Sequence, residues 1–210
     1  RVQPGVVLDS LRNAAEAHRL TFGPDPSTHS RCTLGGMIGN NSSGTHSLLA
    51  GKTVDNVEQL HILLYDGTRL TVGDGAIERL AGEESRVSGI SSRLMALADR
   101  YGDRIGERFP RIPRRVSGYN LDELLPENGC HIARALVGTE GTCAIVLQAK
   151  TRLVTSPPVR ALVVLGYDDM YVAGDRSPHV MRHGPVALGG LDRIIIDDLG
   201  KKGLLADDIA

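Results

Sequence analysis

The sequence is poor in several features that would point to a class of function. It has no Trp, and aromatic residues make up only 3% of the chain, so a core must be built from aliphatic side chains. Its three cysteines, Cys32, Cys130 and Cys143, are far apart and form no C-x-x-C pair. This spacing argues against a zinc or iron–sulfur site on the chain and favours free thiols in a reducing compartment.

Charge of one sign and long apolar runs are also absent. The chain has 24 Lys and Arg against 25 Asp and Glu, without the basic patch or aromatic strip of a nucleic-acid binder. No apolar run reaches the roughly 18 residues of a membrane-spanning helix, and no charged-then-apolar leader is visible. We therefore expect a protein of the cytoplasm or one attached peripherally to a membrane. The chain opens on Arg1 without Met and stops soon after an apolar segment, which favours a fragment of a longer protein.

Glycine, by contrast, is abundant. Many of the 25 glycines fall in residues 35–51 and 129–141. Such clusters indicate loops where the backbone comes close to something else, although turn chemistry alone explains any single glycine equally well. Residues 23–51 are polar and aperiodic between two regular elements, which favours a functional loop.

Periodicity predicts an α+β fold, with a mixed or antiparallel sheet flanked by helices. Apolar spacing predicts helices over residues 8–19 and 90–101, the second capped by Ser88 or Ser91. Two β-prone runs joined by Asp66-Gly67 predict a hairpin over 57–72 with a primed turn. The remaining expectations are an exposed connection over 104–115, short helices over 121–125 and 131–136, and a turn over 139–142. A strand is expected over 144–154, with one face formed by Ile145, Leu147, Ala149, Thr151 and Leu153.

The chain is expected to divide at Ser156-Pro157-Pro158, because this triplet breaks the pattern. Beyond it, residues 160–167 predict a strand. Residues 168–182 predict a helix that Asp168 or Asp169 caps and that Pro178 ends or kinks. A further strand or helix is expected over 185–199.

Residues 22–44 are suited to binding an anion. Paired glycines with hydroxyl and amide side chains can present unpaired N–H donors in a concave array, which suits a pyrophosphate. The sequence has no G-x-G-x-x-G string and no Walker Gly-Lys-Ser/Thr, so a Rossmann or P-loop site is not supported. From the residues alone, a dinucleotide site and a Gly-rich structural loop are equally good readings.

Five strings in order resemble the FAD-linked oxidase family, which has the p-cresol methylhydroxylase or vanillyl-alcohol oxidase type of FAD-binding fold. The strings cover residues 23–28, 33–44, 51–57, 65–68 and 137–146. Within that family the chain is most similar to D-lactate, glycolate and D-2-hydroxyglutarate dehydrogenases, particularly large members fused to iron–sulfur domains. The resemblance implies that residues 1–155 are the second subdomain of the FAD-binding domain and that residues 156–210 begin a substrate-binding cap domain.

The resemblance also implies which residues contact FAD. The first two strings would line the pyrophosphate and the ribityl chain, and the last would lie along the track from isoalloxazine to adenine. The implied contacts are Pro24, Asp25, Ser27, Thr28, Thr33, Gly35, Gly36, Gly39, Asn40, Asn41, Ser42, Gly44, Glu140, Gly141 and Ile145.

The sequence departs from common members of the family in three places. It has Asn-Ser-Ser-Gly at 41–44 where many have Asn-Ala-Gly-Gly, Cys143-Ala144 where many have Leu-Gly, and Gly189 where relatives often carry Glu. The family's first FAD-binding subdomain, with its Arg-Gly-Gly-Gly-Thr loop, would precede Arg1, and the catalytic histidines and arginines of the cap would follow Ala210. We therefore expect no catalytic base and no metal ligand on this chain. His179 and His183 have helical spacing but no third ligand.

The function that the resemblance implies is FAD-dependent oxidation of a D-2-hydroxy acid by hydride transfer to the flavin. Electrons would leave to an iron–sulfur domain, a quinone or a cytochrome. The alternatives are a UDP-sugar reductase with the same FAD fold and a non-enzymatic module that binds an anion or a partner.

Overall fold

The computed structural model describes residues 1–82 and 85–204. The chain divides into two compact units, Arg1–Pro158 and Val159–Ala210. The first unit combines helices with small antiparallel sheets, so the predicted α+β class is confirmed.

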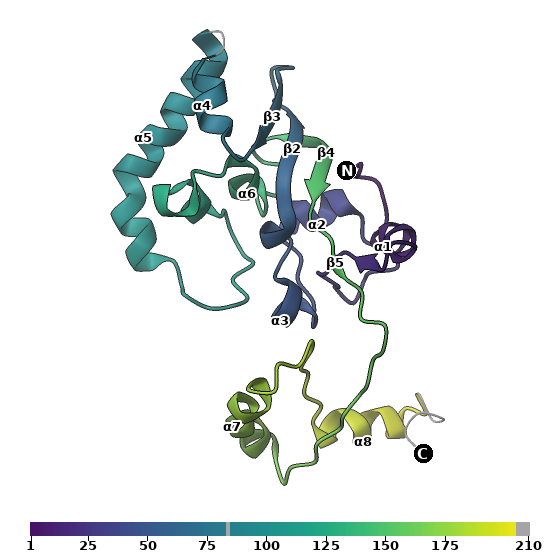
Figure 1. Ribbon diagram of the computed structural model, residues 1–210. Helices are drawn as coiled ribbons and strands as arrows, with labels where there is room; N and C mark the ends of the chain where they lie inside the picture. The colour runs from purple at the N-terminus through teal and green to yellow at the C-terminus, as the bar shows by residue number, and fades with distance from the viewer. Residues whose placement is uncertain (83–84, 205–210) are drawn as a thin grey trace. The chain divides into compact units, whose positions relative to one another are not determined.

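A three-stranded antiparallel sheet is the centre of the first unit. Its central strand β2 (Val57–Leu63) lies between β3 (Arg69–Gly73) and β4 (Ile145–Thr151), as Figure 1 shows. The predicted hairpin over 57–72 is confirmed.

The primed turn predicted for this hairpin is wrong. A primed turn needs a positive φ at its first central residue, and among Asp66 and Gly67 only Gly67 has one, at 88°. Instead, residues 65–67 form a three-residue loop. The Leu64 carbonyl accepts from the Gly67 amide, and the Leu64 amide donates to the Thr68 carbonyl, both at 2.9 Å. Asp66 accepts from the Thr68 amide at 2.9 Å, so its side chain stabilises the loop.

A β-bulge in β4 changes which of its residues face the core. Leu60 pairs with Ala149 and His61 with Gln148, but Ile62 pairs with Val146. Leu147 is therefore the extra residue, and it shifts the alternation by one. Val146 packs against the core while Ile145 and Leu147 are exposed, so the single face predicted for these two residues and Ala149 is wrong.

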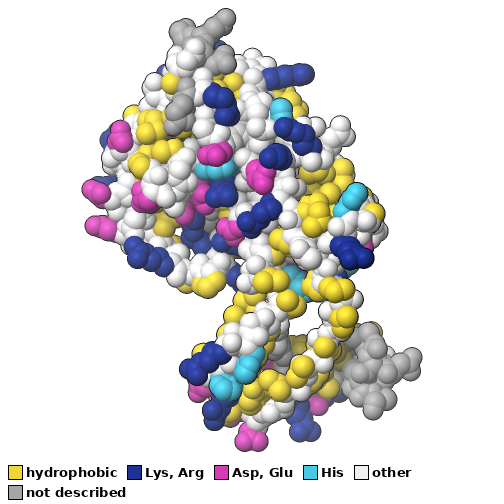
Figure 2. Space-filling view, viewed as in Figure 1, with side chains coloured by type: hydrophobic (Ala, Val, Ile, Leu, Met, Phe, Trp, Pro, Cys, Tyr) yellow, Lys and Arg dark blue, Asp and Glu magenta, His cyan; other side chains and the backbone are white. Residues whose placement is uncertain are grey.

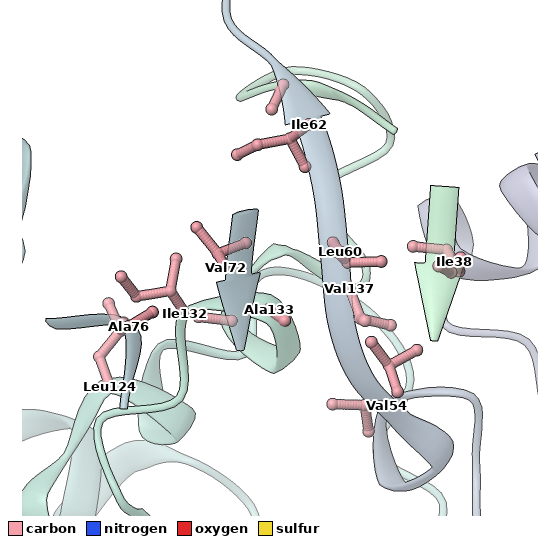
Figure 3. Close-up of a cluster of buried hydrophobic side chains, with 14 of the residues drawn as sticks. Ile38, Val54, Leu60, Ile62, Val72, Ala76, Leu124, Ile132, Ala133 and Val137 are labelled. Atoms are coloured by element: carbon pink, nitrogen blue, oxygen red, sulfur yellow. The ribbon is translucent and has the colours of Figure 1, made fainter. Parts of the chain in front are cut away.

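The core lies between the sheet and α6 (Ile132–Leu136), which contacts β2 and β3. Figure 3 shows Leu60 and Val72 of the sheet beside Ile132, Ala133 and Val137 of the α6 segment. All five side chains are buried, as expected for a core built from aliphatic residues.

Two helices pack on each other beside β3 (Figure 1): α4 (Ala76–Ala81) and α5 (Ser85–Arg108). The predicted helix over 90–101 is confirmed but is longer, and neither Ser88 nor Ser91 caps it. The Ser91 hydroxyl instead donates to the Ser88 carbonyl at 3.1 Å, a back-bond inside the helix. The exposed connection predicted over 104–115 is wrong for residues 104–108, because helix α5 continues to Arg108.

The two ends of the first unit meet. α1 (Leu8–Glu16), within the helix predicted over 8–19, leads to β1 (Leu20–Thr21), which pairs with β5 (Val154–Thr155). Val2 also forms a bridge with Ala149 of β4. The predicted short helix over 131–136 is confirmed, and that over 121–125 is a 3₁₀ turn. The remaining elements are α2 (Leu34–Asn40), α3 (Ser47–Ala50), η1 (Val54–Asn56), η2 (Leu121–Leu124) and η3 (Pro126–Asn128).

The second unit consists of α7 (Met170–Met181) and α8 (Arg193–Lys201) with their connections. The predicted cap is confirmed, because Asp169 accepts from the Val172 amide at 2.8 Å. Pro178 does not end the helix, which continues to Met181. The strand predicted over 160–167 is wrong: this apolar segment has no pairing partner in the described part of the chain, and a strand needs one.

Candidate functional site

An open hollow of about 200 Å³ lies between helix α2 and the end of the sheet. Helix α2 contributes its backbone at Gly35 and Gly39, and β4 contributes Ile145 and Val146. The side chains and backbone that line the hollow are mostly apolar. They belong to Pro4, Gly35, Ile38, Gly39, Ile62, Leu136, Thr139, Gly141, Ala144, Ile145 and Val146.

Helix α2 forms inside the stretch that the sequence predicted to be an aperiodic loop. Leu34, Met37 and Ile38 are its buried side chains, at the i, i+3 and i+4 spacing of an amphipathic helix. Thr33 caps the helix, because its Oγ1 accepts from the Gly36 amide at 3.3 Å. The abundance of small polar residues concealed this short apolar period.

The amides of the first turn of α2 already have acceptors inside the unit. This arrangement contradicts the expectation of unpaired N–H donors here, since an anion would have to displace existing bonds. The acceptors are Val6 O for Leu34, Pro4 O for Gly35, Thr33 Oγ1 for Gly36 and Thr33 O for Met37, at distances between 2.8 and 3.3 Å.

Four of the five glycines of the predicted site divide into two groups. A Cβ on Gly35 would lie 2.7 Å from Pro4 Cβ, and a Cβ on Gly44 would lie 2.1 Å from the Asp25 carbonyl, so both permit close internal packing. A Cβ on Gly36 would meet only Thr33 Oγ1 at 3.4 Å, and one on Gly141 would meet nothing within 4 Å. The second group leaves bare backbone facing open space, as a site for a closely approaching ligand requires.

The turn over 139–142 forms one side of the hollow, and the predicted turn is confirmed. The Gly138 amide donates to Ile38 O and the Glu140 amide donates to Gly39 O, both at 2.9 Å. These two bonds attach the turn to the C-terminal half of α2, although about 100 residues separate them in the chain. The structure thus brings together Gly35, Gly39, Gly141 and Ile145 from the predicted set, and Glu140 is the exposed neighbour of Gly141 in the turn.

Asp25 lies in a second cluster. Its Oδ1 accepts from the His46 amide at 3.0 Å, and its Oδ2 contacts His46 Nδ1. The Gly44 amide donates to Ser47 Oγ at 2.9 Å beside this pair. Both oxygens of the Asp25 carboxylate are therefore occupied in holding residues 24–28 against residues 44–47.

The other predicted residues have different surroundings. Asn41 is fully buried in a left-handed conformation, and its Oδ1 accepts from the Val54 amide at 3.0 Å. Ser42 donates to Asn40 Oδ1 at 2.6 Å on the exposed side. Pro24 is buried, whereas Ser27 and Thr28 are exposed. Direct contact between any of these residues and FAD stays a prediction.

Several residues around the hollow were missed in the sequence. Ile38, Ile62 and Val146 form its apolar wall, and Pro4 and Leu136 close it. Ile62 could have been assigned from the alternation in β2, but Val146 could not, because the bulge at Leu147 is invisible in an apolar run. Pro4 carries no recognisable signal.

Two groups with shifted pKa values lie near the start of α6, and neither lines the hollow. Burial raises the pKa of Glu123 above its usual value. Burial, and then the neighbouring Arg134, lower the pKa of His131, whose Nδ1 accepts from the Arg134 amide at 3.2 Å at the start of α6. Both groups belong to the framework of the unit.

The described residues, 1–82 and 85–204, contain neither a metal-binding cluster nor a membrane-spanning helix. No group of three or more His, Cys, Asp or Glu side chains among them could hold a metal ion. No helix in that part of the chain is both long and apolar enough to cross a membrane.

The chain resembles known flavoproteins. Residues 1–73 match the family model of an FAD binding domain. D-2-hydroxyglutarate dehydrogenase of Pseudomonas putida is 32% identical over 200 residues, which cover 93% of this chain and 20% of that protein. The glycolate oxidase subunit GlcD of Bacillus subtilis is 26% identical over 208 residues, which cover 97% of this chain and 34% of that protein. A solved structure of alkyldihydroxyacetonephosphate synthase aligns over 75% of this chain at 17% identity, with a TM-score of 0.44.

These matches identify a flavoprotein domain, with FAD as its cofactor. The matches agree with the resemblance to the FAD-linked oxidase family that the motifs indicated. It spans about a fifth of the length of the D-2-hydroxyglutarate dehydrogenases that it matches.

Proposed function

We propose that this chain forms one wall of the FAD site in an enzyme that oxidises a D-2-hydroxy acid. The observation that carries the proposal is the hollow, most of whose lining comes from two of the strings that resemble the family, residues 33–44 and 137–146. When bound, FAD supplies the acceptor for the hydride that leaves the α-carbon of the substrate.

The hollow fits a planar, largely apolar group. Ile38, Ile62 and Val146 offer dispersion contacts and exclude water from one face of such a group. The bare backbone of the turn lets the group approach closely, because Gly141 lines the hollow and a Cβ there would meet nothing within 4 Å.

Glu140 is the charged group of the turn. It is exposed, and its carboxylate has no hydrogen bond or ion pair with another described residue. It can therefore accept hydrogen bonds from a ligand at the rim. In this proposal residues 24–28 and 40–42 contribute further polar contacts to FAD. Asp25 acts indirectly, because its hydrogen bond from the His46 amide holds residues 24–28 in place.

The residues that line the hollow include no titratable side chain. The proton of the substrate hydroxyl therefore needs an acceptor outside this lining. In the same proposal, residues 1–155 are the FAD-binding part, residues 156–210 open the substrate domain, and electrons pass to a quinone, a cytochrome or an iron–sulfur domain. The protein would work in the cytoplasm or at the membrane surface.

An anaerobic titration tests the proposal. The enzyme that contains this chain, with its FAD, is mixed with D-lactate, glycolate or D-2-hydroxyglutarate, and the visible flavin absorbance is followed. We expect at least one acid to bleach the flavin, while the L enantiomers of the chiral acids leave it oxidised. Bleaching by NADPH and by none of the acids would favour a UDP-sugar reductase instead. A protein that retains no flavin would contradict the proposed FAD site itself.

A further inference from the structure

Two tyrosines from distant parts of the first unit meet the turn that borders the hollow. The Tyr65 hydroxyl, at the tip of the β2–β3 hairpin, donates to the Gly141 carbonyl at 2.7 Å. The Tyr119 hydroxyl lies 2.5 Å from Thr142 Oγ1. The two phenols thus contact consecutive residues of one short turn.

The direction of the second bond follows from the donors available. Thr142 Oγ1 donates its single proton to the Thr139 carbonyl at 2.6 Å. Tyr119 is therefore the donor to Thr142, and the bonds run from the phenol through the hydroxyl to the backbone of the turn. Removing the phenol would leave the hydroxyl of Thr142 without its donor.

The turn needs these contacts, because little else holds its outer side. Glu140 and Gly141 both have left-handed backbones, with φ of 51° and 75°. For Glu140 this conformation is unfavourable, and residues of this kind persist where their surroundings hold them, often at ligand sites. Residues 140–143 are all exposed, so side-chain burial does not fix the turn. On its inner side the amides of Gly138 and Glu140 bond to α2.

We propose that Tyr65 and Tyr119 are positioning residues that hold the 139–142 turn against the bound flavin. This inference rests on the proposed FAD site. The amide bonds to α2 set where the turn begins, and the two phenols set where Gly141 and Thr142 lie. Fixing the turn before the ligand arrives removes part of the ordering cost of binding.

The test uses phenylalanine variants of the FAD-containing protein, since Tyr→Phe removes one hydroxyl and keeps the ring. We expect Tyr65→Phe and Tyr119→Phe each to raise the dissociation constant for FAD by about fivefold, and the double variant by about 25-fold. Tyr171→Phe is the matched control, because Tyr171 is an exposed tyrosine of the second unit. It should bind FAD as the wild type does.

A second readout separates positioning from a merely structural role. The flavin midpoint potential and the visible flavin spectrum should shift in the double variant and stay constant in Tyr171→Phe. Amide hydrogen exchange should become faster at residues 140–142 of the double variant. A purely structural role would lower the unfolding temperature and leave the potential and spectrum of the bound flavin unchanged.

The outcomes distinguish this inference from the proposed function. Wild-type protein that binds no FAD would overturn both. Wild-type protein that binds FAD, with a double variant of equal affinity and potential, would overturn the positioning role alone. Weaker binding together with a shifted potential would support it.

Discussion

The two units use their apolar residues in opposite ways. In the first unit Leu60, Phe22 and Leu8 are completely buried. In the second unit no described residue is buried, and Leu162 and Val164 are exposed by 91% and 85%. Figure 2 shows hydrophobic side chains spread over the surface of the second unit. Apolar composition alone therefore does not make a core; it needs a second element to pack against.

The helices of the two units sharpen this contrast. α8 has Ile194, Ile195 and Ile196, yet all three are exposed. α6 is shorter, but Ile132 and Ala133 are buried because the sheet lies against them. A helix of the first unit is stabilised mainly by tertiary packing, whereas α7 and α8 rely on their caps and on local bonds.

The strongest test of this contrast truncates one leucine in each unit. Leu60→Ala should lower the free energy of unfolding by about 2–5 kcal/mol, because it leaves a cavity between the sheet and α6. Leu162→Ala should change it by less than about 0.5 kcal/mol, because the side chain is already in solvent. Urea unfolding measures both. Equal losses in the two variants would show that Leu162 is buried in solution.

Two neighbouring glycines of α2 test the division between packing and ligand contact. Gly35→Val should disrupt folding, since its Cβ would lie 2.7 Å from Pro4 Cβ. Gly36→Val should fold, at a cost of about 1 kcal/mol or less, but lose the flavin because the side chain enters the open space beside α2. Circular dichroism and the flavin-to-protein absorbance ratio after gel filtration measure the two effects.

Arg111→Ala, an exposed site in the same unit, is the control for flavin content and should retain it. If Gly36→Val folds and keeps a full complement of flavin, the surface of α2 does not contact FAD. The family-based assignment of residues 33–44 would then be withdrawn.

A buried histidine in one unit and an exposed one in the other give a pH test. Burial lowers the pKa of His131 in the folded protein, so the unfolded chain binds its proton first. Stability from the neutral ring is therefore complete above the unfolded value of about 6.5 and is lost as pH falls through the lower folded pKa. His131→Asn keeps a residue that can cap α6 and should flatten this dependence below about pH 6.5.

His183→Asn, in the exposed helix α7 region, should leave the pH profile of unfolding unchanged. Urea titrations across the same pH range compare both variants with the wild type. If the free energy of unfolding of the wild type falls no more than that of His131→Asn as the pH is lowered, His131 makes no contribution.

The smallest effect is expected from removing the second unit. A chain that ends at Pro158 should unfold with a free energy within about 0.5 kcal/mol of the first unit in the longer chain, since each compact unit has its own contacts. Chemical denaturation followed by circular dichroism provides the comparison. A larger loss would mean that the first unit depends on residues 159–210.

The sequence predicted the elements whose signals are local. The 57–72 hairpin followed from alternation around Asp66-Gly67, and the cap of α7 followed from Asp169. The predicted primed turn was wrong because a three-residue loop that ends in a left-handed glycine contains the same Asp-Gly dipeptide. Helix α2 was missed because Leu34, Met37 and Ile38 give only one short apolar period.

Tertiary context decided the other misses. The bulge at Leu147 depends on how β4 meets β2, and residues 160–167 cannot form a strand without a partner. Within the site, the motifs predicted Gly35, Gly39, Gly141 and Ile145, which the hollow unites. They did not predict the internal bonds of the first α2 amides, because those acceptors, Pro4 and Val6, lie outside the motif.

The pairing of both ends of the first unit has a consequence for its synthesis. Val2 bridges Ala149, and β1 pairs with β5, so segments of this unit that are synthesised earlier wait for segments that are synthesised later. Helix α5 and the hairpin can form while the chain is still growing, but the sheet lacks β4 until that strand has left the exit tunnel. Contacts this distant in sequence slow folding. During this interval the unpaired edge of β2 is open to aggregation, and a chaperone that binds nascent chains would protect it.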